Sequence, residues 1–105
     1  STPLLRDEPM KMVLMIVDAG HAEDIKRLLQ DCDVPGYSEI PNVLGMGTTG
    51  KKLGSRAFPG SSTLFMVALE EHCVELLSEK LRQLRETNGS SEGLKAFSFD
   101  AEELL

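Results

Sequence analysis

The chain has 105 residues, 41% hydrophobic and 27% charged, which is the composition of one small globular domain and excludes a disordered or fibrous chain. Its net charge of −6 disfavours general nucleic-acid binding, because an acidic surface repels phosphate backbones. No apolar run reaches the ~20 residues of a membrane span, and the first residues show no signal-peptide pattern. We therefore expect a cytoplasmic protein without direct membrane insertion.

The first half of the chain predicts a strand, a helix and a second strand after a flexible N-terminal arm over residues 1–9. The segment Met10–Val17 contains a continuous apolar run from Met12 to Val17, which is typical of a buried strand. Ala22–Asp31 has apolar residues at helical spacing and a polar opposite face, which predicts an amphipathic helix. Tyr37–Leu44 predicts a weaker strand. Because Pro41 has no backbone donor, this strand should lie at a sheet edge or contain a bulge.

The second half begins with a long loop over residues 45–62, which holds five of the nine glycines. The apolar run Thr63–Leu69 predicts a second buried strand, and Glu71–Asn88 predicts a second amphipathic helix. Lys95–Asp100 predicts a last strand that places Phe97 and Phe99 on one face. Residues 101–105 form an acidic C-terminal end.

The order of these elements is β-α-β-β-α-β, which predicts an α+β ferredoxin-like sandwich over residues 10–100: a four-stranded antiparallel sheet with two helices on one face. The first and third strands lie at the centre of that sheet, and these are the two strands with continuous apolar runs. Their second face would leave a large apolar surface in water, because the helices cover only one face. We therefore expect a homo-oligomer that buries the second face.

The long loop carries Lys51, Lys52 and Arg56 and no acidic residue, so its charge is +3 and that of the remaining chain is −9 (−6 minus +3). A basic, glycine-rich loop is suited to binding an anion or a partner, and a solvated hairpin extension is the alternative. Residues 45–52 nearly match a P-loop. We reject that motif because Lys52 replaces the metal-binding hydroxyl and the glycines and proline of 53–60 cannot open a helix.

The remaining candidates for chemistry are few. Cys32 and Cys73 are expected to be buried free thiols. His21 is expected in a surface turn, whereas His72 and Cys73, as helix neighbours, should point about 100° apart and form no metal pair by themselves. No nucleophile–base arrangement and no acid/base carboxylate pair has a recognisable spacing, so we do not expect an enzyme.

Three segments, together with the order of elements, resemble the PII signalling-protein superfamily. They are Val34–Ser38, the Gly45–Gly47 turn that opens the long loop, and Glu92–Phe97. The resemblance implies a homotrimer whose sheets face inward, with adenine nucleotides bound in clefts between subunits. The long loop (the T-loop) and the loop before the last strand (the B-loop) would line each cleft. The T-loop would contact a protein partner, a membrane transporter or an enzyme.

Carried over by position, the resemblance assigns two groups of residues. It implies effector binding by Gly36, Ser38, Gly45, Gly47, Gly89, Glu92, Gly93 and Lys95. It leaves partner binding to the basic residues of the T-loop, Lys51, Lys52 and Arg56.

The chain also departs from this family's pattern. Its B-loop stretch 88–93 has no lysine, its C-terminal end has no arginine, and its only tyrosine, Tyr37, lies outside the T-loop. We expect no tightly bound cofactor. The possible effectors are ADP, AMP and ATP, and these departures weaken the case for ATP. They favour ADP, AMP, another small anion such as bicarbonate, or no nucleotide at all. The alternative is a CutA-like trimer associated with divalent metals, whose candidate ligands are His21, Cys32, His72 and Cys73.

Overall fold

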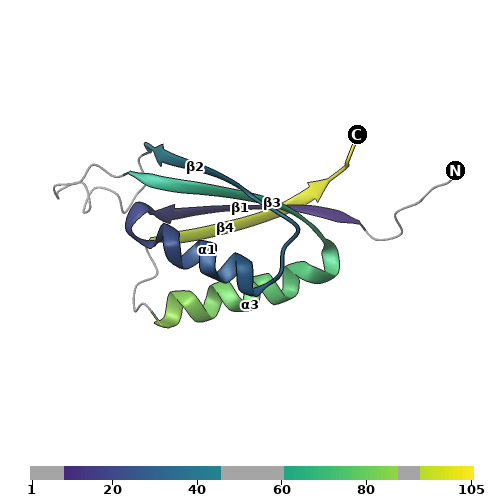
Figure 1. Ribbon diagram of the computed structural model, residues 1–105. Coiled ribbons are helices and arrows are strands. Elements are labelled where there is room, and N and C mark those ends of the chain that lie inside the picture. Colours follow the sequence, from purple (N-terminus) through teal and green to yellow (C-terminus); the bar gives the residue numbers. More distant parts are fainter. Residues whose placement is uncertain (1–8, 46–60, 88–92) are drawn as a thin grey trace, which may run out of the picture.

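The computed structural model describes residues 9–45, 61–87 and 93–105, and the structural statements below concern these residues. Their order of elements is the predicted one, with a short 3₁₀ turn (η1) added before the first helix (Figure 1). The elements are β1 (Met10–Asp18), η1 (Ala19–His21), α1 (Ala22–Asp31), β2 (Ser38–Val43), β3 (Ser62–Glu70), α3 (Glu71–Thr87) and β4 (Leu94–Ala101).

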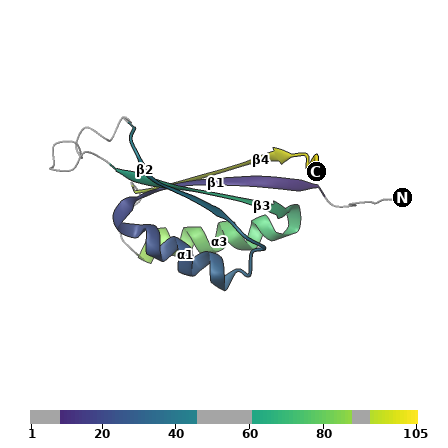
Figure 2. The same ribbon diagram turned by 45° about the horizontal axis from the view of Figure 1, so that its top comes forward.

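The four strands form one antiparallel sheet in the order β2-β3-β1-β4. Both helices lie on the same face of this sheet, and the opposite face carries no element of the described chain (Figures 1 and 2). The predicted α+β ferredoxin-like fold is therefore confirmed. The strands with continuous apolar runs, β1 and β3, occupy the centre as expected, because central strands have neighbours on both sides and the least access to water.

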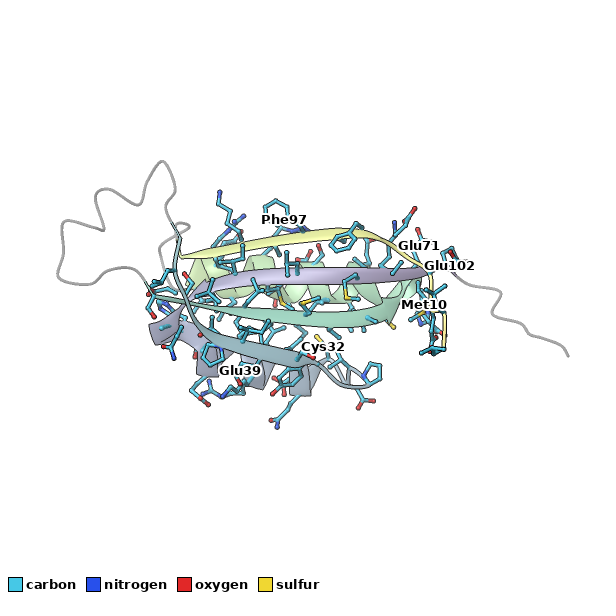
Figure 3. All side chains as sticks on the ribbon, turned by 90° about the horizontal axis from the view of Figure 1, so that it is seen from above. Met10, Cys32, Glu39, Glu71, Phe97 and Glu102 are labelled. Atoms are coloured by element: carbon cyan, nitrogen blue, oxygen red, sulfur yellow. The ribbon has the colours of Figure 1, made fainter. Side chains whose placement is uncertain are left out.

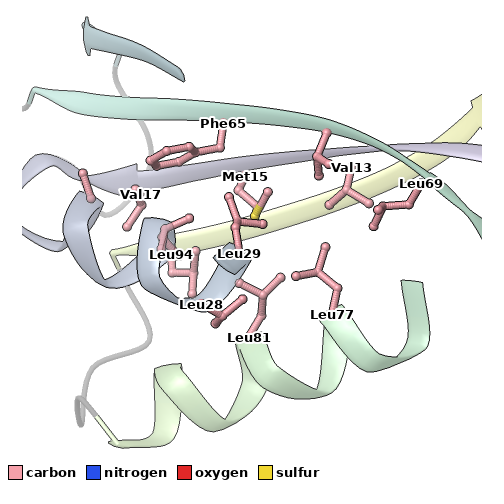
Figure 4. Packing of buried hydrophobic residues seen from close by; sticks show 13 residues of the cluster. Val13, Met15, Val17, Leu28, Leu29, Phe65, Leu69, Leu77, Leu81 and Leu94 are labelled. Carbon is pink, nitrogen blue, oxygen red and sulfur yellow. The ribbon is translucent and has the colours of Figure 1, made fainter. Parts of the chain in front are cut away.

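The core lies between the sheet and the two helices (Figure 4). Phe65 of β3 and Met15 of β1 are fully buried there, and Leu29 of α1 is buried with them. The apolar stripe of α3 contributes Leu77 and Leu81. Alternate residues of each central strand point into this layer because successive side chains of a strand face opposite sides.

The other residues of the central strands form an open face, which Figure 3 shows from above. In the register of the sheet, Leu14 of β1 lies between Met66 of β3 and Phe97 of β4. Phe97 and Phe99 keep 54% and 50% of their surface exposed. Nothing in the described chain covers this side, as expected for two helices on one face, and burial of the second face by another copy stays a prediction. The residues of the open face include Met12, Leu14, Ile16, Ser38, Ile40, Val43, Leu64, Met66, Ala68, Lys95, Phe97 and Phe99.

The β2 strand lies at an edge of the sheet and also contains a bulge, as Pro41 predicted. Ile40 pairs with Leu64 and Val43 with Ser62, so two residues of β2 lie opposite one residue of β3. Asn42 adopts a left-handed conformation with φ of 60° inside this bulge. The extra residue keeps Val43 on the same face as Ile40, although an odd spacing of three would otherwise place them on opposite faces.

Both cysteines are free thiols, as expected, but they are only half-buried. Cys73 lies on α3, and Cys32 directly follows the last residue of α1. Burial is the largest influence on the Cys32 thiol and raises its pKa, while the charge of Lys80 acts in the opposite direction. A thiol with a raised pKa carries less thiolate at neutral pH, which does not favour a reactive cysteine at this position.

Candidate functional site

The backbone around both predicted binding loops converges on one end of the sheet. Asp18, the last residue of β1, donates its amide hydrogen to the carbonyl of Gly93 at 2.9 Å. The next amide, that of Ala19, donates to the carbonyl of Ser61 at 3.3 Å. The turn after β1 is thus tied to the residues that follow the segments 46–60 and 88–92. The predicted T-loop and B-loop therefore begin or end at a common turn of the chain.

Gly93 has a packing reason to be glycine. A Cβ atom at this position would lie 3.3 Å from the Cβ of Asp18, closer than most side chains tolerate. The absence of a side chain lets the start of β4 approach the end of β1. The carbonyl of Gly93 can then accept the hydrogen bond from Asp18.

One half of the predicted effector site lies along β2. Ser38 is the first residue of this strand and lies opposite Met66, while Gly36 precedes the strand and Gly45 follows it by two residues. All three are exposed. A Cβ atom at Gly36 or Gly45 would meet no neighbour within 4 Å, so neither glycine is required by packing within the described chain.

Two contacts hold the β2 edge against the rest of the domain. The ring of Tyr37 packs edge-on against that of Phe65, with 5.8 Å between the ring centroids and an angle of 64°. Glu39 accepts an ion pair from Lys26 of α1 at 3.3 Å. A hydrogen bond to Glu23, followed by the contact with Glu39, raises the pKa of Lys26, so the lysine stays charged. These two contacts fix β2 to the domain on the helix side of the sheet, while most of its other positions stay exposed.

The other half of the predicted site lies at the start of β4, where Gly93 precedes the strand and Lys95 is its second residue. Lys95 pairs in register with Ile16 and is exposed on the open face. The strand β4 forms the edge opposite β2, with β1 and β3 between them. Three spacings of about 4.8 Å place the two halves roughly 14 Å apart in one chain. A single chain therefore does not bring the two halves together.

The remaining predicted site residues lie outside the described residues. They are Gly47, Lys51, Lys52, Arg56, Gly89 and Glu92.

The structure adds two arginines that the sequence analysis missed. Arg82 and Arg85, in the last turns of α3, line a cavity of about 210 Å³ between this helix and β4. Arg85 donates from Nη1 to the carbonyl of Leu94 at 3.5 Å. Their spacing of three residues places them on the same side of the helix, which was the available signal. That this side of the helix faces β4 follows only from how α3 packs on the sheet.

The metal alternative finds little support in the described part of the chain. His72 and Cys73 were expected to point apart, and that expectation is wrong: Nε2 of His72 lies 3.4 Å from the Cys73 Sγ. Side chains of neighbouring helix residues can bend toward each other although their Cβ atoms diverge. Even so, the described residues contain no group of three or more His, Cys, Asp or Glu side chains that could hold a metal ion. His21 lies 3.7 Å from Asp18, at the loop end of the sheet.

The family model described as nitrogen regulatory protein P-II matches residues 10–104. The chain belongs to this family. No curated protein sequence matches it. Membership agrees with the resemblance that the sequence predicted and does not support the CutA alternative.

Solved structures of PII-like proteins and of a functionally unknown protein share this fold. The apo form of CPII from Thiomonas intermedia K12, a nitrogen regulatory PII-like protein, is 22% identical, with 89% of each chain covered and a TM-score of 0.68. The same protein bound to ADP, AMP and bicarbonate is 20% identical, with a TM-score of 0.64 over 92% of this chain and 97% of that one. A functionally unknown protein from Pediococcus pentosaceus is 15% identical, with a TM-score of 0.64 over 93% and 97%.

Neither helix in the described part of this PII family member is long and apolar enough to cross a membrane.

Proposed function

We propose that the protein is a cytoplasmic, non-enzymatic PII-like regulator. It acts as a homotrimer that binds a small anionic effector, an adenine nucleotide such as ADP or AMP, in clefts between its subunits. The loop over residues 45–62 then contacts a protein partner, a membrane transporter or an enzyme, and its conformation depends on the bound effector. The effector changes the loop by binding one of its conformations more tightly than the others.

The observation that carries this proposal is the separation of the two halves of the predicted site. Ser38 and Gly45 belong to one edge of the sheet and Gly93 and Lys95 to the other. A second copy whose β2 edge meets the β4 edge of the first would complete the cleft. The apolar open face supplies the reason for such an assembly, because its burial between copies removes Phe97 and Phe99 from water.

The solved relatives support the class of effector. CPII was crystallised with ADP, AMP and bicarbonate, and in another structure with ADP, AMP and acetate. These ligands combine an adenine base with phosphates, or are small carboxylate-like anions. A small anionic ligand of this kind is what we expect here, because the loop is basic although the rest of the chain is acidic.

Calorimetric titration with ADP, with and without magnesium, tests the effector. We expect a dissociation constant in the micromolar range and one site per chain. Light scattering on the same sample should give about three times the chain mass of 11.5 kDa. A monomer at micromolar concentration would contradict the proposed cleft between subunits. The absence of heat at concentrations that detect millimolar binding would contradict the proposal that the effector is an adenine nucleotide.

The double variant Lys51→Ala/Lys52→Ala tests the loop. Removal of two cations from a solvated loop should weaken effector or partner binding without lowering the melting temperature. The matched control is Lys80→Ala, which removes a cation from α3 instead of the loop. Binding that is unaltered in the double variant would contradict the role given to the loop.

A further inference from the structure

A groove runs between α3 and the β4 edge of the sheet. Its end nearest Gly93 is the cavity of about 210 Å³ that Arg82 and Arg85 line. A smaller cavity of about 90 Å³ continues it and shares Ser78, Leu81 and Ala96 with the first. The short side chains of Ala96 and Ser98 leave this space open on the side of β4. The walls of the smaller cavity include the apolar residues Val13, Val74 and Leu77.

Arg85 is the unusual residue of this groove. Its hydrogen bond to the carbonyl of Leu94 is long and partly buried. Among the residues that the structure describes, no carboxylate pairs with it. Arg85 is only partly buried, so its guanidinium can be reached from the cavity, and its one described partner is a neutral carbonyl. A guanidinium carries five donors, so most of those of Arg85 remain available to a ligand.

Arg82 adds a second cation to the same cavity. It forms an ion pair with Glu79 at 3.2 Å, and both side chains keep more than half of their surface exposed, 52% and 56%. An exposed ion pair one helical turn apart contributes little to stability. Arg82 can therefore exchange Glu79 for a ligand anion at little cost.

We infer that the Arg82–Arg85 end of this groove binds the oxyanion of a small organic ligand, a phosphate or carboxylate group, whose uncharged part lies along the apolar walls. Two guanidinium groups on one side of a cavity can donate hydrogen bonds to the oxygens of a phosphate or carboxylate. The inference deepens the proposed function and rests on it for the kind of ligand. It adds the residues that hold the charge, on the helix side of the β4 edge next to Leu94.

A purely structural role for Arg85 makes a different prediction. An arginine in the last turn of a helix interacts favourably with the helix dipole and with the final carbonyls. If this were its whole role, Arg85→Gln would lower the melting temperature and leave ligand affinity unchanged. Affinity and melting temperature therefore have to be measured on the same samples.

The test is calorimetry on the full chain with three probes: ADP, inorganic pyrophosphate and adenosine. We expect Arg85→Gln to weaken ADP and pyrophosphate about 10-fold or more, because a hydrogen bond to a charged group is worth about 1.5–3 kcal/mol. Arg82→Gln should have a smaller effect. Adenosine has no anionic group, so its affinity should not change. Arg27→Gln is the matched control, since Arg27 is exposed on α1 and paired with Asp24 at 3.3 Å.

The outcomes separate this inference from the proposed function. If the wild type binds ADP and the variants bind it equally well, the inference is overturned and the regulator proposal stands. If the wild type binds pyrophosphate through Arg85 but not ADP, the anion site stands and the nucleotide proposal fails. If the wild type binds neither, both fail. Should Arg85→Gln not fold, Arg85→Lys keeps the charge without the fork of donors, and an affinity equal to wild type for both anions would overturn the bidentate site.

Discussion

The two faces of the sheet are made from alternate residues of the same strands, yet their surroundings differ sharply. On the helix side, Val13, Met15 and Val17 of β1 keep 4%, 0% and 2% of their surface exposed. On the open side, their neighbours Met12, Leu14 and Ile16 are only partly covered. The residue types are equally apolar on both sides. An apolar strand sequence therefore predicts that both faces of the strand avoid water. The structure of one chain shows which face its own helices cover.

The same comparison separates two kinds of effect. Side chains of the helix-covered face stabilise the fold of each chain, because their burial is complete within it. Side chains of the open face are only partly covered within one chain, so they contribute less to its fold, and the rest of their apolar surface is available for contacts between molecules. The predictions below use this difference, beginning with the largest expected effect.

Phe65→Ala should give the largest loss of stability, because Phe65 is fully buried on the helix side and the truncation leaves a cavity. Loss of a buried phenylalanine side chain typically costs about 3–5 kcal/mol. Urea denaturation followed by circular dichroism measures it. The matched control is Leu76→Ala on α3, where 51% of the side chain is exposed, with an expected change within about 0.5 kcal/mol. Similar losses of unfolding free energy in both variants would mean that burial of the side chain does not determine its contribution to stability.

Leu14→Asp should act on assembly instead of folding. Leu14 lies between Met66 and Phe97 at the middle of the open face, so a carboxylate there would have to be buried without a partner in any assembly that covers this face. We expect light scattering to give the single-chain mass of 11.5 kDa while the far-ultraviolet circular dichroism spectrum is retained.

Gln30→Asp introduces the same charge on the exposed side of α1 and controls for Leu14→Asp. It should leave the mass unchanged. If Leu14→Asp kept the wild-type assembly, the open face would not be the surface between copies.

Substitutions at Asn42 test the bulge that keeps Ile40 and Val43 on the open face. Asn42→Gly fits a φ of 60° and should change stability by only a few tenths of a kcal/mol. Asn42→Val should cost about 1–2 kcal/mol, since a β-branched residue is strained in the left-handed region. Urea denaturation of the two variants side by side measures the difference. Equal stability would indicate that the bulge relaxes when the residue is changed.

Asp100→Asn should have the smallest effect and depends on pH. Lys11 donates a hydrogen bond to Asp100 at 2.7 Å, and this bond, followed by the lysine charge, lowers the pKa of Asp100 below its ordinary value of 3.8. A lowered pKa in the folded state means that the pair stabilises the fold above about pH 3.8 and loses this contribution as the pH falls through the lowered value.

The wild type should therefore be slightly more stable than Asp100→Asn at neutral pH, and the two should converge in acid. Melting temperatures from pH 2 to pH 7, roughly the range of the carboxyl titration, measure this difference. Because Asp100 is largely exposed, added salt should reduce it. A difference that stays constant across this pH range would show that the ion pair is not its source.

Much of the fold could be predicted because its signals are local. The helical spacing of α1 gave both of its bounds, Ala22 and Asp31, and Pro41 indicated the edge position and the bulge of β2. Such patterns depend on the period of a helix or strand and on which backbone groups can donate hydrogen bonds. The contact of His72 with Cys73 was not predicted, because side-chain torsions rather than helix geometry determine it.

The candidate site was predictable only in part. The resemblance to PII proteins named Gly36, Ser38, Gly93 and Lys95, but only the strand order shows that these residues lie on opposite edges of one sheet. Arg82 and Arg85 carry no motif, and their shared cavity exists because α3 packs beside β4. The sequence by itself determined the elements, the apolar strands and the acidic body with its basic loop, since each depends on the type and spacing of neighbouring residues. The tertiary structure alone decided which groups from distant segments share a face, an edge or a groove, because those distances depend on how the strands pair and where the helices pack.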